Sequence, residues 1–180
     1  MSGNGLRRVM DGPAIDRALV RLAHEVVERH QGVDGLALVG IRSRGVYLAE
    51  RIHRTLAGID PAVKTPFGVI DITFYRDDLD RGLQTPEIRS TDITFQVEGA
   101  SILLVDDVLF TGRTIRAAMD AVIDYGRPRA IELAVLVDRG HRELPIKADY
   151  VGKNIPTSRN QRVSVRLAEV DGTDEVIVEG

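Results

Sequence analysis

The sequence predicts an α/β fold built on a doubly wound, mainly parallel sheet, and three observations lead to this prediction. Two apolar runs, at 36–41 and 102–105, have the length and composition of buried parallel strands. A helical spacing of apolar residues follows each run, at 46–56 and 114–125. Strand 101–106, helix 114–125 and strand 131–137 then form a strand–helix–strand unit, which is typical of such sheets.

The remaining elements are predicted in chain order. Residues 1–10 are expected to be a mobile lead-in, and Asp11-Gly12-Pro13 predicts the start of an amphipathic helix. A strand is expected at 67–74, followed by a polar stretch at 75–92 whose length is typical of a functional lid or of disorder. Gly126 and Pro128 end the helix at 114–125. Residues 138–161 are expected to be irregular, and the alternation from Val163 predicts an edge or antiparallel strand.

Composition limits the class of protein. The 180 residues predict a single domain, 1–180, with 43% hydrophobic and 28% charged residues, as is ordinary for a globular protein. There are no cysteines, which excludes disulfides and thiolate metal sites. No membrane-length apolar run or signal-peptide pattern is present, so a cytoplasmic protein that does not enter membranes is expected. The net charge of −3 argues against nucleic-acid binding over the whole surface but not against a local basic patch.

The stretch 101–122, SILLVDDVLFTGRTIRAAMDAV, is typical of a sugar-phosphate site. An apolar strand ends in Asp106 and Asp107, which can accept hydrogen bonds from two neighbouring sugar hydroxyls. The short loop with Thr111, Gly112 and Thr114 then lets backbone N–H groups close around a phosphate at a helix start. No Lys follows the glycine, so this is not a P-loop. Paired aspartates also occur in receiver domains, but near the first strand and without a Thr-Gly-Arg-Thr loop. An ordinary turn without a ligand site is the other alternative. It would place two carboxylates at the end of an apolar strand, at a desolvation cost that no partner offsets.

Five sequence blocks carry a family resemblance. VDDVLFTGRT resembles the phosphoribosyl pyrophosphate signature of type I phosphoribosyltransferases. GIRSRG at 40–45, DITFYRDD at 71–78, VDRGHRELPI at 137–146 and VGKNIPTS at 151–158 resemble the family of bifunctional pyrimidine operon regulators and uracil phosphoribosyltransferases. The resemblance covers the chain from about Pro13 onward, with the blocks in the family's order.

The resemblance implies a type I phosphoribosyltransferase fold with a small hood at about 138–180 and a flexible lid loop at about 75–92. It implies the conversion of uracil and phosphoribosyl pyrophosphate to UMP and pyrophosphate, with Mg²⁺ held mainly through substrate and no metal-ligating residues of the protein's own. Asp106, Asp107 and Arg44 would be catalytic, with Asp107 preferred as proton acceptor. Pyrophosphate would bind a loop that often contains a non-proline cis peptide. The implied substrate-binding residues are Ser43, Arg44, Gly45, Arg89, Asp106, Asp107, Val108, Leu109, Phe110, Thr111, Gly112, Arg113, Thr114, Arg139 and Val163.

The family also implies binding of pyrimidine operon leader mRNA, favoured by UMP or UTP, and assembly into a homodimer or higher homo-oligomer. Between 139 and 162 there are six Lys or Arg against two acids, a local excess typical of a phosphate-binding patch. The candidate RNA-binding residues are Arg17, Arg21, His24, Arg142, Lys147 and Lys153. Val20 departs from the Thr expected in RNA-binding relatives. Three alternatives stay open. The basic residues of the first helix would be an ordinary solvated face, or those at 139–162 would make subunit contacts. The whole chain would otherwise be a salvage phosphoribosyltransferase without RNA regulation.

Overall fold

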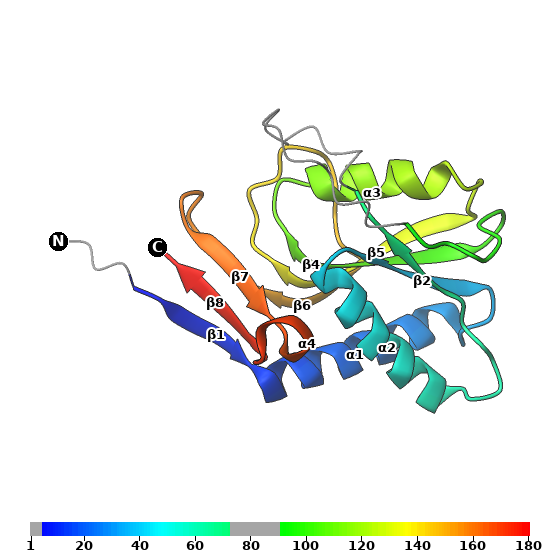
Figure 1. Cartoon of the computed structure of the whole chain (residues 1–180), viewed down its shortest axis with the longest axis horizontal. Coiled ribbons are helices and arrows are strands. Elements are labelled where there is room, and N and C mark those ends of the chain that lie inside the picture. Colours follow the sequence, from blue (N-terminus) through cyan, green and yellow to red (C-terminus); the bar gives the residue numbers. More distant parts are fainter. Residues whose placement is uncertain (1–4, 73–90) are drawn as a thin grey trace.

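The computed structural model describes residues 5–72 and 91–180 (Figure 1). In this part of the chain, the elements follow in the order β1 (Arg7–Asp11), α1 (Gly12–His30), β2 (Leu36–Ile41), α2 (Arg44–Ile59), β3 (Phe67–Ile70), β4 (Ser101–Leu109), α3 (Arg113–Ile123), β5 (Ala130–Asp138), β6 (Tyr150–Asn154), β7 (Arg162–Arg166), α4 (Ala168–Asp171) and β8 (Glu175–Glu179).

The central sheet has five parallel strands in the order β3-β2-β4-β5-β6. Helices α1 and α2 cover one face of this sheet and α3 covers the other (Figure 1). Successive side chains of a strand point to opposite faces, so β2 contributes to both layers: Leu38 packs with α1 and α2, and Val39 packs with α3. This double burial explains why the central strands are continuous apolar runs, and it confirms the predicted doubly wound sheet.

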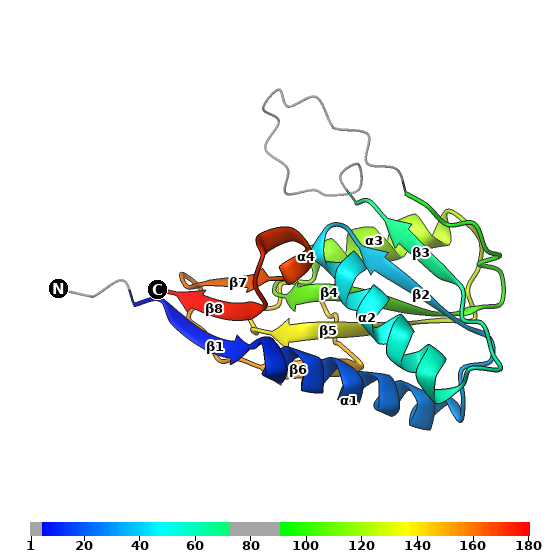
Figure 2. The same ribbon diagram turned by 60° about the horizontal axis from the view of Figure 1, so that its bottom comes forward.

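A second sheet of three antiparallel strands, in the order β1-β8-β7, lies beyond one end of the central sheet (Figure 2). It joins the two ends of the described chain, because Arg7 pairs with Val178 and Asp11 pairs with Glu175. Arg51 of α2 fixes the turn around α4 to the helical layer, with its guanidinium donating to Glu169 at 2.6 and 2.9 Å and to Asp174 at 2.8 and 2.9 Å. This three-stranded unit is called the hood sheet below.

Most of the predicted elements are confirmed, with small shifts of their ends. Helix α1 begins where expected, with the Asp11 side chain accepting a hydrogen bond from the Ala14 N–H at 2.9 Å. Helix α2 starts two residues before the predicted 46. Strand β3 ends at Ile70, and the predicted continuation at 73–74 lies outside the described residues, as does most of the predicted lid.

Two predictions about secondary structure are wrong. Residues 7–10 are not a lead-in but part of β1, which buries only Met10 and so shows no alternation in the sequence. Residues 150–154 are not irregular but form β6, a polar edge strand paired with β5. The segment 138–180, expected to form a hood, contains β6 of the central sheet as well as β7 and β8, and β1 pairs with β8 from the other end of the chain. Helix α4 and strand β8 are not predicted at all.

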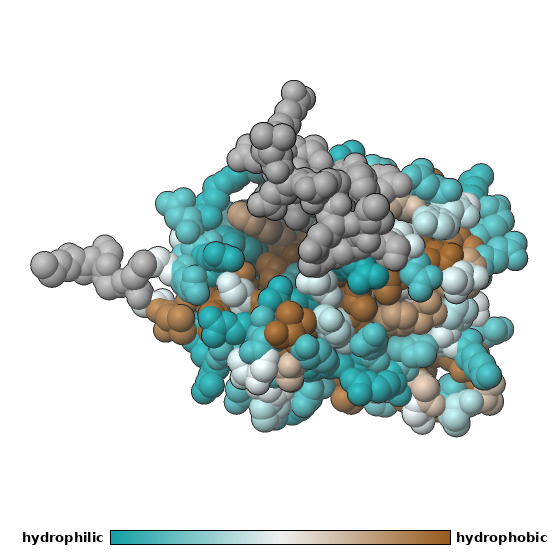
Figure 3. Space-filling model, viewed as in Figure 1, coloured by the Kyte–Doolittle hydropathy of each residue, from teal (hydrophilic) through white to brown (hydrophobic). Residues whose placement is uncertain are grey.

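The surface is consistent with a core enclosed between these layers. Hydrophilic residues cover most of the face in Figure 3, and apolar residues appear on it only in small separate areas. Within residues 5–72 and 91–180, no helix has the length and hydropathy needed to cross a membrane.

Candidate active site

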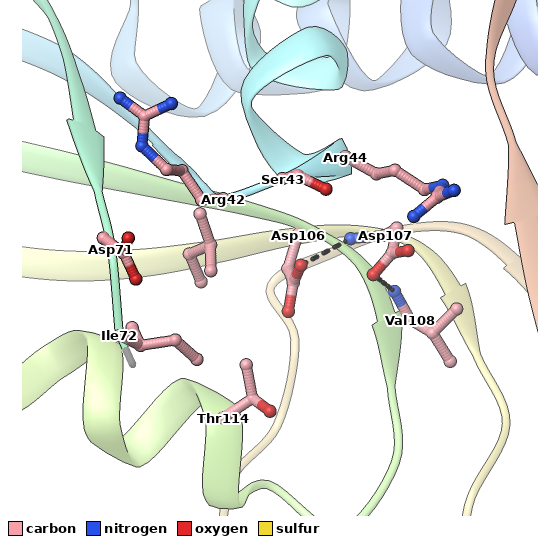
Figure 4. Close-up of a pocket in the computed structure, with 10 residues that line it drawn as sticks. Arg42, Ser43, Arg44, Asp71, Ile72, Asp106, Asp107, Val108 and Thr114 are labelled. Carbon is pink, nitrogen blue, oxygen red and sulfur yellow. Dashed lines mark hydrogen bonds between the residues drawn. The ribbon is translucent and has the colours of Figure 1, made fainter. Parts of the chain in front are cut away.

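The candidate site begins where β4 leads into α3. Asp106 is buried, and its Oδ1 accepts a hydrogen bond from the N–H of Asp107 at 2.9 Å. The Oδ1 of Asp107 in turn accepts from the N–H of Val108 at 2.8 Å. These local bonds fix both carboxylates at the carboxyl end of the strand (Figure 4). Gly112 then turns the chain into α3 with a φ of 94°, a left-handed conformation that favours glycine.

The neighbouring parallel strand β2 brings the second loop to the same edge, because Gly40 is in register with Val105. The Arg42–Ser43 peptide bond is cis, as the family resemblance implies, and α2 starts directly after it. Gly45 allows the close contact of this loop with β4: a Cβ at Gly45 would lie 2.5 Å from the carbonyl oxygen of Val105. The first turn of α2 therefore packs against the backbone that carries Asp106.

A cavity of about 310 Å³ lies between these two loops and the end of β3. In Figure 4 Arg42 points away from the carboxylates, whereas Arg44 extends past Ser43 toward Asp107, and Thr114 lies on the far side of Asp106. The lining residues are Ile41, Arg42, Ser43, Arg44, Asp71, Ile72, Asp106, Asp107, Val108 and Thr114. The predicted carboxylates, pyrophosphate loop and phosphate loop thus meet around one polar cavity.

The carboxylate of Asp107 is electrostatically unusual. Burial raises its pKa, and the hydrogen bonds to its oxygens and the nearby charge of Arg44 only partly oppose this effect. A carboxylate with a raised pKa is a stronger base than an exposed one, which suits proton transfer near neutral pH.

A second cavity, of about 450 Å³, adjoins the first beneath the hood sheet. Arg44 and Asp107 line both cavities, and Val163 lines the second, where the resemblance places a base pocket. Arg44 is held across this junction by Asp171, to which it donates from Nη2 at 2.8 Å and from Nε at 3.2 Å. The hydrogen bond and charge of Arg44 lower the pKa of Asp171, which keeps this carboxylate ionised.

Seven of the predicted substrate residues that the structure describes line neither of these two cavities: Gly45, Leu109, Phe110, Thr111, Gly112, Arg113 and Arg139. Leu109 is buried in the core on the α3 side. The guanidinium of Arg139 lies 3.9 Å from the centroid of the Phe110 ring and donates to the carbonyl of Ser158 at 3.0 Å, and burial lowers its pKa. Arg113 donates from Nε to Glu143 at 3.2 Å. Arg89 lies outside the described residues.

The candidate RNA-binding residues fall into two groups. Arg17, Arg21, His24 and Lys147 are exposed. Arg21 also donates to the carbonyls of Val151 and Gly152 at 3.2 and 2.6 Å, and the exposed Lys153 donates to the carbonyl of Val9 at 3.2 Å. Arg142 differs, because its guanidinium bonds within the protein to Phe110, Asp138 and Ile146.

The sequence-based search for site residues missed Asp71 and Asp171. Asp71 is a buried carboxylate that lines the first cavity at the end of β3. The available signal was its position directly after the apolar residues 67–70, since carboxyl ends of parallel strands meet at one edge. Asp171 gave no such signal, because its partner Arg44 is 127 residues away in the chain.

Comparisons with known proteins agree with this geometry. Residues 6–169 match the phosphoribosyl transferase domain family. The chain is 58% identical over 170 residues to the bifunctional protein PyrR of Thermoanaerobacter sp. (strain X514), covering 94% of this chain and 95% of that one. It is 57% identical over 173 residues to the bifunctional protein PyrR of Listeria monocytogenes serotype 4b (strain CLIP80459), covering 94% of each.

Solved structures give the same fold at much lower identity. The hypoxanthine phosphoribosyltransferase of Trypanosoma cruzi superposes with a TM-score of 0.72 at 20% identity, over 96% of this chain and 95% of that one. The corresponding enzyme of Staphylococcus aureus gives a TM-score of 0.69 at 18% identity, over 95% of this chain and 90% of that one. Together with the two loops around the carboxylates, these matches show that the chain belongs to the phosphoribosyltransferase family and, within it, to the bifunctional PyrR proteins.

Proposed function

We propose that this chain converts uracil and phosphoribosyl pyrophosphate to UMP and pyrophosphate, and that with a uridine nucleotide bound it binds the leader mRNA of pyrimidine biosynthesis operons. The observation that carries the enzymatic half is the junction of the two cavities. Arg44 and Asp107 line both, so one ligand can reach from the phosphate and pyrophosphate loops to the hood sheet. A ribosyl phosphate with a base attached has this extent.

The roles of the residues follow from their positions. The 5′-phosphate binds in the turn from Thr111 to Thr114, where backbone N–H groups and the start of α3 favour an anion. Asp106 and Asp107 accept hydrogen bonds from the ribose hydroxyls and stabilise the positive charge that develops on the ring. Ser43 and Gly45 hold the pyrophosphate through the backbone, and Arg44 neutralises part of its charge.

The base binds against the hood sheet, in contact with Val163. Asp107 is the preferred acceptor of the uracil N1 proton, because it lines both cavities and burial raises its pKa. Arg139 packs on the Phe110 ring outside the lining of both cavities, so its implied role at the base stays an expectation.

Mg²⁺ fits the donor set of the first cavity. Asp71, Asp106 and Asp107 supply the carboxylate oxygens that this hard cation prefers. In the part of the chain that the structure describes, no group of three or more His, Asp or Glu is arranged to hold a metal. As the family resemblance implies, we expect the ion to be held mainly by substrate oxygens and water, where it would neutralise pyrophosphate charge.

The proposed RNA binding rests on two sequence segments, α1 and 147–153, that lie next to each other on the surface. Helix α1 lies beside the edge strand β6 (Figure 2). Arg21 links them through its bonds to Val151 and Gly152, so the basic residues of α1 and of 147–153 face solvent on adjacent elements. Positive side chains on such a surface bind the phosphates of a folded RNA, while unpaired bases provide specificity. Assembly into a homodimer or higher oligomer and a cytoplasmic location remain expectations.

The RNA-binding half is tested by measuring the affinity of the chain for its own operon leader stem-loop. Binding should be tighter with UMP than without it, and it should weaken between two salt concentrations. His24→Ala and Lys147→Gln should lower affinity, with Lys147→Gln also reducing the salt slope by about 1. Arg129→Gln, at an exposed site before β5, is the matched control. Equal binding of a scrambled RNA would leave a salvage enzyme as the better account.

A further inference from the structure

The guanidinium of Arg142 bonds to three segments next to the proposed phosphate-binding turn at 111–114. Its Nη1 donates to the carbonyl of Phe110 at 2.8 Å, and its Nε donates to the carbonyl of Ile146 at 2.9 Å. Its Nη2 forms an ion pair with the carboxylate of Asp138, at the end of β5. One guanidinium thus ties the end of β5, the loop after β4 and its own segment together.

The residues that follow Arg142 bind the next peptide of the loop. The carbonyl of Thr111 accepts from the N–H groups of Glu143 at 2.9 Å and Leu144 at 3.2 Å. Gly112 packs against the same segment, since a Cβ there would lie 3.3 Å from the Cβ of Ile146. The segment 142–146 therefore contacts three consecutive residues of the phosphate loop, yet none of its residues lines the first cavity.

This contact determines where the loop N–H groups point. In a planar trans peptide, the carbonyl of one residue and the N–H of the next point in opposite directions. When Arg142 holds the Phe110 carbonyl, the N–H of Thr111 is directed away from the segment. The bonds to the Thr111 carbonyl direct the N–H of Gly112 in the same way. An anion bound in the turn requires these donors to be oriented before it arrives.

We propose that Arg142 is a positioning residue for the 5′-phosphate, acting through the Phe110 carbonyl. This inference rests on the proposed phosphate site at 111–114. Lysine cannot take the same role, because a single nitrogen cannot bridge the Phe110 and Ile146 carbonyls with the planar geometry of a guanidinium. Through the same segment, a filled phosphate site would also order the chain that leads to Lys147.

The test compares a ligand with the phosphate and one without it. Equilibrium binding of UMP and of uridine is measured for the wild type, Arg142→Gln, Arg142→Lys and the control Arg129→Gln. We expect Arg142→Gln and Arg142→Lys to weaken UMP binding about tenfold, as one oriented contact is lost, with uridine affinity unchanged. The KM for phosphoribosyl pyrophosphate should rise by a similar factor, and the KM for uracil should not change.

Three results are decisive. An equal loss of UMP and uridine affinity, or no loss of either, would overturn the assignment to Arg142. If the Arg142 variants do not fold, Asp138→Asn removes only the Nη2 anchor and should weaken UMP binding two- to threefold, again without affecting uridine; an unchanged UMP affinity would overturn the assignment. A wild type that binds UMP no better than uridine would instead contradict the phosphate site itself.

Discussion

Arg44 and Asp171 form an ion pair with two N–O contacts, at 2.8 and 3.2 Å, that joins the first turn of α2 to α4, the short helix between the hood strands β7 and β8. Arg44 belongs to the proposed pyrophosphate loop, and Asp171 lines the cavity proposed for the base. The pair therefore connects the two ends of the proposed substrate site without entering the phosphate loop. Pyrophosphate would compete with Asp171 for the same guanidinium.

Asp171→Asn should lower stability in a pH-dependent way. The pKa of Asp171 is lowered by Arg44, so its contribution is present above the unfolded pKa of about 3.9 and is lost as pH falls through the folded value. At pH 7 we expect a loss of roughly 1 kcal/mol, or a melting temperature lower by about 2–4 °C. Thermal melts of wild type and variant from pH 7 to pH 3 should converge at the acid end. A constant difference across this range would rule out the ion pair as the cause.

Arg51→Gln should destabilise the chain more than Asp171→Asn does. Its side chain is only 12% exposed and binds two carboxylates, Glu169 and Asp174, which would be left unpaired in a half-buried site. We expect a loss of about 2–3 kcal/mol, measured by urea unfolding. Arg54→Gln, one turn along the exposed side of α2, is the control and should change stability by less than about 0.5 kcal/mol. Similar losses of stability in both variants would show that the ion pairs of Arg51 with Glu169 and Asp174 are not the cause.

Asp107→Asn should separate activity from stability. The turnover should fall about 10²–10³-fold, because a carboxylate that stabilises the transition state is lost. Burial raises the pKa of Asp107, so the folded state holds the proton more tightly and the ionised carboxylate is a cost that grows as pH rises above about 3.9.

Because it removes this cost, Asp107→Asn should melt at a higher temperature than the wild type at pH 7. Near pH 3 the two melting temperatures should be the same. Asp34→Asn, at an exposed site before β2, should change neither turnover nor melting temperature. Full turnover in Asp107→Asn would remove Asp107 from the mechanism. A lower melting temperature at pH 7 would show that its burial is not costly.

Gly45→Ala and Gly58→Ala, both in α2, should have opposite effects. A methyl group at Gly45 would lie 2.5 Å from the Val105 carbonyl oxygen, so α2 must shift away from β4. We expect a loss of about 2–3 kcal/mol and of most activity. A methyl group at Gly58 meets nothing within 4 Å and should stabilise the helix by about 0.5–1 kcal/mol. Calorimetry of both variants checks this, and a Gly45→Ala variant as stable as wild type would refute the close contact.

The parts of the site that were predictable are those that lie close together in the chain. Asp106 and Asp107 lie in the last part of one buried strand and Thr114 lies in the first turn of the next helix, so a local pattern was enough to predict that they share one site. That Ser43 and Asp106 line the same cavity was also predictable, because the carboxyl ends of parallel strands lie at one edge of the sheet.

The parts that were not predictable depend on long-range pairing. Strand β1 owes its structure to β8 at the other end of the chain, and its own five residues carry little preference for a strand. The basic excess at 139–162 made Arg142 a candidate RNA-binding residue. Charge counts alone cannot show that its guanidinium also bonds to the carbonyls of Phe110 and Ile146.

The most direct test of the account is the choice of base. The two solved structures compared above are hypoxanthine phosphoribosyltransferases, whereas the two relatives compared by sequence are PyrR proteins. Pyrophosphate release from phosphoribosyl pyrophosphate and Mg²⁺ should be measured with uracil and with hypoxanthine, together with chromatography of the nucleotide formed. The account predicts UMP formation with uracil and no release above background with hypoxanthine. Turnover of hypoxanthine, or none with uracil, would contradict it.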